Sequence, residues 1–158
     1  MKITWPANDA LRPLDLLAGR LDSTIAPRIV QLLNETDAAA AWRVVLDDSR
    51  EVGWLAARTA PLAGRSAGVV RAGLRATHPI GPIEESMLST TSGDALRLVQ
   101  RLALEVPEGR AFVVVQASWS WVAGNELVVL STSSAEPALA ELLIAQVDAL
   151  AAKIVIDV

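Results

Sequence analysis

The chain has 158 residues, of which 52% are hydrophobic, with a net charge of −4 and no cysteine. The length fits one domain over residues 1–158, and the lack of cysteine excludes a disulfide framework and zinc-thiolate sites. The apolar stretches fall short of the ~18 residues of a membrane span, and the acidic balance argues against nucleic-acid binding. The start shows no secretory signal pattern, so we expect a cytoplasmic protein. We also expect no metal and no cofactor.

The first 60 residues predict a helical start followed by strands. Residues 2–5 fit a short strand, and apolar side chains at helical spacing over residues 10–35 suggest a broken pair of helices. Residues 42–46 and 52–60 are strand-like and flank a polar turn at residues 47–50, which predicts a β-hairpin.

The middle of the chain mixes the two periodicities. Residues 61–68 fit a loop, and residues 70–76 alternate apolar and polar side chains as a half-buried strand does. The proline-flanked stretch 80–90 fits a crossing loop. Residues 93–105 carry apolar side chains on one broad helical face, so they predict a helix that ends before Pro107.

The last third predicts a hairpin and a helix. Residues 111–122 form a strand, and Gly124-Asn125 suits the tight turn that returns through residues 127–130. The spacing of polar residues over 133–136 fits a capping box at the start of a helix that runs to about residue 150. A short apolar stretch at residues 154–156 follows it.

Few motifs in this sequence suggest catalysis. Gly64-Arg65-Ser66-Ala67-Gly68 matches the G-x-S-x-G pattern of a hydrolase nucleophile, but a strand is expected after it where a helix is needed, and His78 is the one histidine. The acidic pairs Asp47-Asp48 and Glu84-Glu85 do not suggest a shared metal or catalytic site, because adjacent residues on a strand point apart. We therefore expect no catalytic residues and no metal site.

Tryptophan and arginine supply the candidate binding residues. Trp119 and Trp121 share one face of the predicted strand 111–122, where they are either part of the core or, with Trp54, part of a partner-binding surface. Residues 50–78 carry five basic side chains and one acidic one. Within them Arg71 and Arg75, together with Arg58, are candidates for gripping acidic side chains or a terminal carboxylate, with a solvated strand face as the alternative.

These elements define an α+β fold in which an antiparallel β-sheet of about five to six strands packs against helices in the order α-βββ-α-ββ-α. This order over residues 9–152 resembles type III secretion chaperones and the YbjN-like family. The resemblance implies homodimerisation and binding of a protein client without a reaction. We therefore predict a non-enzymatic protein-binding domain of chaperone, adaptor or immunity type, which binds its partner through an apolar, tryptophan-containing surface.

A second hypothesis is a helix-grip protein of the Bet v 1/START type. Such proteins hold an apolar small molecule between an antiparallel sheet and the last helix. On this hypothesis Trp119, Trp121, Leu139, Leu143 and Val147 line a cavity. The helix predicted at residues 93–105 argues against it, because helix-grip proteins run their central strands without such an interruption.

Overall fold

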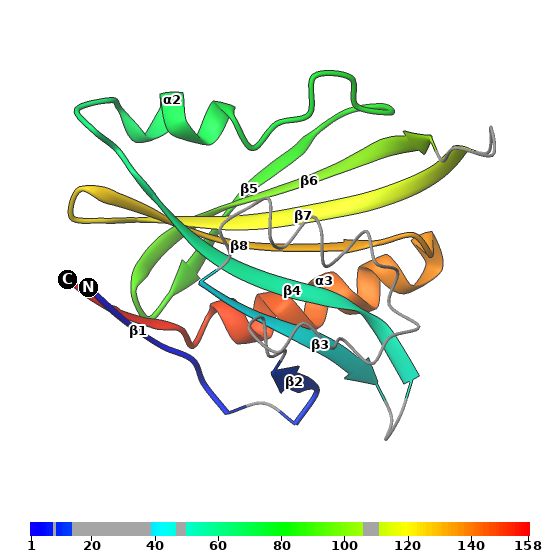
Figure 1. Ribbon diagram of the computed structural model, residues 1–158, viewed down its shortest axis with the longest axis horizontal. Helices are drawn as coiled ribbons and strands as arrows, with labels where there is room; N and C mark the ends of the chain where they lie inside the picture. The colour runs from blue at the N-terminus through cyan, green and yellow to red at the C-terminus, as the bar shows by residue number, and fades with distance from the viewer. Residues whose placement is uncertain (8, 14–38, 47–49, 106–110) are drawn as a thin grey trace.

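The computed structural model describes residues 1–7, 9–13, 39–46, 50–105 and 111–158. This part of the chain forms a seven-stranded antiparallel sheet, a separate two-stranded ribbon and two helices, arranged as in Figure 1. The large sheet has the strand order β2-β3-β4-β8-β7-β6-β5. The elements are β1 (Lys2–Thr4), β2 (Leu11–Pro13), β3 (Ala40–Leu46), β4 (Arg50–Pro61), α2 (Ala67–Ala72), β5 (Glu84–Thr90), β6 (Gly93–Glu105), β7 (Ala111–Ala123), β8 (Glu126–Ser134), α3 (Pro137–Ala151) and β9 (Val155–Asp157).

The predicted fold class is wrong. The sequence predicted a balanced α+β fold with five to six strands, whereas the described residues form nine strands and two helices. The protein is therefore a sheet-rich fold. The error arose mainly in the middle of the chain, where a strand replaces a predicted helix, a helix replaces a predicted strand, and β5 occupies most of the predicted crossing loop.

Residues 93–105 are the long strand β6 and not a helix. β6 lies inside the sheet between β5 and β7, and it is covered on both faces. Val99 packs in the core on one face, while its neighbours Leu98 and Gln100 are buried on the other. A strand covered on both faces carries apolar side chains at consecutive positions, and this spacing imitates that of a helix.

Residues 67–72 form the short helix α2, where the sequence predicted the end of a loop and the start of a strand at residue 70. Ser66 caps this helix, because its side-chain oxygen accepts a hydrogen bond from the backbone N–H of Val69 at 3.4 Å. Val70 and Leu74, one helical turn apart, pack on a small buried cluster made of Leu62, Leu127 and Val129. We call the side of the sheet that α2 covers the α2 face.

The main hydrophobic core lies on the opposite side, which we call the α3 face. Helix α3 lies along this side of β4, β7 and β8 (Figure 1). Its side chains Ala140, Leu143, Val147 and Leu150 recur at helical spacing and are buried against the sheet. Because a fully buried leucine or valine contributes about 1.5–3 kcal/mol, this face supplies most of the apolar stabilisation.

Both predicted hairpins are confirmed. β3 pairs with β4, although their turn residues 47–49 lie outside the described part. β7 pairs with β8 through a turn at Gly124, whose φ of 58° suits a tight hairpin. The predicted capping box before α3 is not formed, because the N-cap residue is Glu136 and makes no side-chain cap hydrogen bond.

The remaining predictions concern the two ends of the chain. The predicted strand at residues 2–5 is β1, which pairs with β9, so that Lys2 lies opposite Asp157. Residues 11–13 are strand β2. The rest of the predicted helical pair lies outside the described residues, as does the pair Asp47-Asp48. None of the described helices has the length and apolar character needed to cross a membrane.

Candidate functional site

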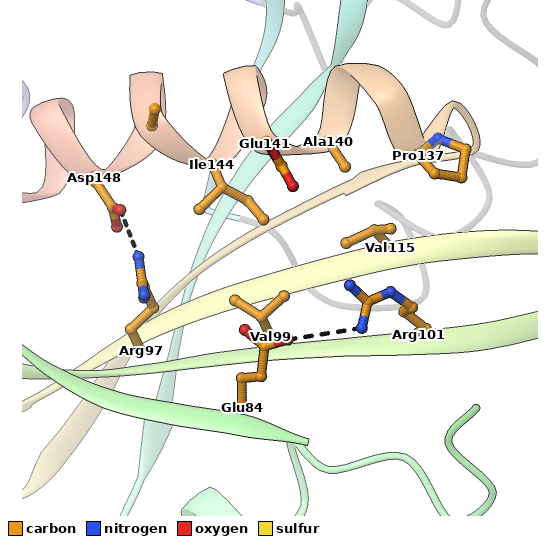
Figure 2. A pocket seen from close by; sticks show the side chains of 11 residues that line it. Glu84, Arg97, Val99, Arg101, Val115, Pro137, Ala140, Glu141, Ile144 and Asp148 are labelled. Atoms are coloured by element: carbon orange, nitrogen blue, oxygen red, sulfur yellow. Dashed lines mark hydrogen bonds and ion pairs between the residues drawn. The ribbon is translucent and has the colours of Figure 1, made fainter. Parts of the chain in front are cut away.

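A cleft of about 340 Å³ lies between α3 and strands β5, β6 and β7 (Figure 2). Its walls follow from the two periodicities of the chain, because α3 contributes residues one turn apart and β6 contributes alternate residues. The floor is apolar and consists of Val99, Val115, Ala140 and Ile144. This floor continues the main core to the surface, so the cleft opens beside the core rather than replacing part of it.

Five charged side chains surround the floor of the cleft. Arg97 Nη1 lies 2.7 Å from Asp148 Oδ2, and Arg101 Nη1 lies 3.6 Å from Glu84 Oε1. Glu141 has no ion pair or hydrogen bond with another described residue, and Figure 2 shows its carboxylate directed from α3 toward the strands. With two pairs compensated, the lining carries one uncompensated negative charge.

One end of the cleft is fixed by a hydrogen-bond network around Asp148. Its Oδ1 accepts a hydrogen bond from Trp119 Nε1 at 2.7 Å, while Oδ2 pairs with Arg97. Trp119 is fully buried, so its indole N–H needs such an acceptor inside the protein. Arg97 Nε also donates to Ser86 Oγ at 3.0 Å, which ties α3 to β5, β6 and β7.

The structure places the predicted tryptophans in the interior. Trp119 and Trp121 have exposed fractions of 0% and 1% and belong to the core beneath α3. Trp54 is buried as well, but it faces the α2 side, because its neighbour Leu55 faces the core. The three indoles therefore do not come together, and they present no surface to a partner.

The cavity lining predicted for a helix-grip protein is also corrected. Leu143 and Val147 have exposed fractions of 1% and are packed in the main core. The cleft uses the neighbouring stripe of α3, which contains Glu141, Ile144 and Asp148. Sequence reasoning followed the most apolar stripe of the helix, and that stripe is the one that packs against the sheet.

The predicted arginine cluster is divided. Arg71 is on α2, where its Nε donates to Ser120 Oγ at 3.0 Å and its Nη2 to the Ser120 carbonyl at 2.9 Å. Desolvation by burial lowers the pKa of the Arg71 guanidinium. Arg58 on β4 and Arg75, which follows α2, instead line one cavity on the α2 face. Two of the three candidates thus share a site, and the third ties α2 to the sheet.

The G-x-S-x-G motif does not form a nucleophile elbow. β4 leads through a turn into α2, so the strand-turn-helix order is present, contrary to the predicted strand. The positive φ angles fall on Ala63 (49°) and Gly64 (77°), whereas Ser66 has an ordinary φ of −68° and caps the helix. His78 is exposed and makes no hydrogen bond with another described residue.

The carboxylates of Glu84 and Glu85 point apart as expected, but they lie on strand β5 and are held in ion pairs, whereas the sequence predicted solvated acids in a loop. Glu84 pairs with Arg101 on the α3 face, and Glu85 accepts from Arg75 Nε at 2.8 Å on the α2 face. They share no site, and the described residues contain no group of three or more side chains suited to a metal ion.

The charged residues of the cleft were missed by sequence reasoning. Arg97 and Arg101 lie in the segment predicted as a helix, so their alternation along β6 was not recognised. Comparison with protein-family models gave no match, and comparison with curated proteins gave none either. The resemblance to type III secretion chaperones and YbjN-like proteins therefore stays a prediction.

Proposed function

We propose that the protein binds a small molecule in the cleft, and that this ligand has an apolar body and one positive charge. The observation that carries the proposal is an apolar floor among charges that are compensated in pairs, except at Glu141. The volume of about 340 Å³ falls in the range of small-molecule sites, roughly 300–1,000 Å³. An apolar body on this floor would leave its cationic group within the field of the Glu141 carboxylate.

The architecture supports this proposal over a protein-binding surface. The objection to a helix-grip arrangement was a helix at residues 93–105, and that segment is strand β6. A ligand between the last helix and the sheet is what the helix-grip hypothesis implies. The partner surface predicted around Trp119 and Trp121 loses its basis, because both indoles are buried. Homodimerisation and a cytoplasmic location stay predictions.

We propose binding rather than catalysis. Apart from Glu141, the acidic groups of the cleft are held in ion pairs, and Asp148 also satisfies a buried indole. A general acid or base needs a free group within reach of the substrate proton. Glu141 is the one acidic group of the cleft that is free among the described residues. In the described part of the cleft it has no second free acidic or basic group beside it with which it could act as an acid–base pair.

The test compares three ligands that share one body: phenylbutylamine, phenylbutanol and phenylbutyrate. Isothermal titration should give the tightest binding for the amine and the weakest for the acid. Glu141→Gln should weaken amine binding by up to about fivefold, because an exposed ion pair contributes ~0.2–1 kcal/mol. The same change should leave the alcohol unaffected, and Glu126→Gln, outside the cleft, should alter neither.

A second variant tests the place of binding. Ala145 is exposed and lines the cleft, so Ala145→Phe fills part of it without disturbing the core. It should weaken all three ligands, whereas Ala138→Phe, on the same helix but outside the cleft, should weaken none. The proposal fails if no member of the series binds, if the acid binds as tightly as the amine, or if Ala145→Phe has no effect.

A further inference from the structure

A second cavity of about 220 Å³ lies on the α2 face, on the other side of the sheet from the cleft. The segment that follows α2, residues 73–76, forms one wall, and β4, β6, β7 and β8 form the rest. Gln100 holds this wall in place: its Oε1 accepts from the Ala76 backbone N–H at 2.8 Å, and its Nε2 donates to the Leu74 carbonyl at 2.9 Å. We call this site the polar cavity.

The lining of the polar cavity offers hydrogen-bond donors that have no partner. Arg58 makes no ion pair or hydrogen bond within the described part of the chain. Ser118 has an exposed fraction of 5%, and its buried hydroxyl lacks a hydrogen-bond partner in the described structure. Ser131, directly opposite Ser118 in the register of β7 and β8, adds another hydroxyl. A buried hydroxyl without a partner is unfavourable, and a bound acceptor removes that penalty.

The charged residues of the polar cavity suit a ligand that carries one negative charge. No acidic side chain is among its described lining residues. Arg75 is already paired with Glu85, since Nη2 lies 2.6 Å from Oε1. Arg58 therefore supplies the one uncompensated positive charge, and a guanidinium donates two parallel hydrogen bonds to a carboxylate. Leu74 and Leu102 make part of the wall apolar, which suits a short hydrocarbon tail.

We propose that the polar cavity binds a small monocarboxylate. Arg58 pairs with the carboxylate, the Ser118 hydroxyl donates a hydrogen bond to it, and the tail lies against Leu74 and Leu102. This site is separate from the cleft and takes a ligand of the opposite charge. Its ligand chemistry is that of a short organic acid.

The test is a titration of the whole protein with propionate, in a buffer without other carboxylates or phosphate. Binding is measured by the chemical shifts of the backbone amides in NMR spectra. Saturable shifts are expected for residues 74–76 and around Ser118. Because a hydrogen bond to a charged group is stronger than a neutral one, Ser118→Ala should weaken binding by about tenfold and Arg58→Met by at least about tenfold. Arg65→Met is the matched control, since among the described residues the Arg65 side chain bonds to the Leu62 and Pro61 carbonyls, which lie outside the cavity.

The Ser118→Ala variant also separates a binding role from a structural one. Without propionate its thermal midpoint should equal or exceed that of the wild type, while its propionate affinity falls. Glu141→Gln, on the other face, should leave propionate binding unchanged. The proposal is overturned if wild type shows no saturable binding at tens of millimolar propionate, or if both cavity variants bind as wild type does. Sulfate binding as tightly as propionate would overturn the assignment to a carboxylate.

Discussion

The two cavities lie on opposite faces of one sheet and differ in how the protein treats charge. In the cleft, Arg97 and Arg101 are neutralised by acids of the chain itself. In the polar cavity, Arg58 and the buried Ser118 hydroxyl have no partner among the described residues. The difference teaches that the number of charged residues at a site says little about its ligand, whereas the pairing of those residues says a great deal.

The largest effect on the free energy of unfolding is expected at Asp148, so this residue gives the strongest test of the comparison. Asp148→Ala should lower the free energy of unfolding by about 2–3 kcal/mol, because it leaves the buried Trp119 N–H without an acceptor and Arg97 without its partner. Urea unfolding measures this change. Glu141→Ala, on the same stripe of α3, should stay within about 0.5 kcal/mol of the wild type. Equal losses of stability in the two variants would show that Asp148 and Glu141 contribute alike to the fold, and that the partners of Asp148 make no difference.

A smaller effect is expected at Gln100, which fixes the wall of the polar cavity. Gln100→Leu should cost about 1–2 kcal/mol, because it leaves the Ala76 N–H and the Leu74 carbonyl without their buried partner. Hydrogen exchange at the Ala76 amide should become faster while amides of β7 keep their protection. Unchanged exchange at Ala76 would mean that the wall is held by other contacts.

The smallest effect, and the one of opposite sign, is expected for two serines on the same strand. Ser118→Ala should raise the free energy of unfolding by up to about 1 kcal/mol, since it removes an unpaired buried hydroxyl. Ser120→Ala should lower it by about 1 kcal/mol, because Ser120 Oγ accepts from Arg71. Thermal unfolding of the two variants side by side measures both. A loss of stability in both variants would contradict the view that the Ser118 hydroxyl has no partner in the described structure and can donate a hydrogen bond to a ligand.

Strands in which polar and apolar residues alternate, or which follow a clear turn signal, were predictable, whereas the long strand β6 was not. β7 alternates the polar Gln116 and Ser118 with the apolar Ala117 and Trp119, so its strand character and its core face were visible in the sequence. β6 carries apolar side chains at consecutive positions such as Leu98 and Val99, both buried, and this spacing matched that of a helix. The short helix α2 was missed because two arginines imposed an apparent alternation on a segment that Ser66 caps as a helix.

The candidate sites were less predictable than the strands. Arg58 and Arg75 were proposed from the basic segment 50–78, and the structure brings these two to one cavity. Arg71 was included because a strand was expected there, and on a helix its side chain reaches Ser120 instead. The cleft was beyond reach, because it depends on where α3 lies across β6, a long-range arrangement that no local pattern specifies.

The pairing of β1 with β9 decides how the domain responds to a mechanical load on its ends (Figure 1). Lys2 and Asp157 lie opposite each other at the outer end of this antiparallel ribbon. A force that separates them loads the hydrogen bonds of the ribbon one pair at a time, as in a zipper, rather than all together. The ribbon has its own strand pairing, but Ile3 and Ile156 pack against the main core and the Ile156 N–H donates to Ser92 Oγ, so opening the ribbon uncovers this edge of the core while the ladders of the seven-stranded sheet stay paired.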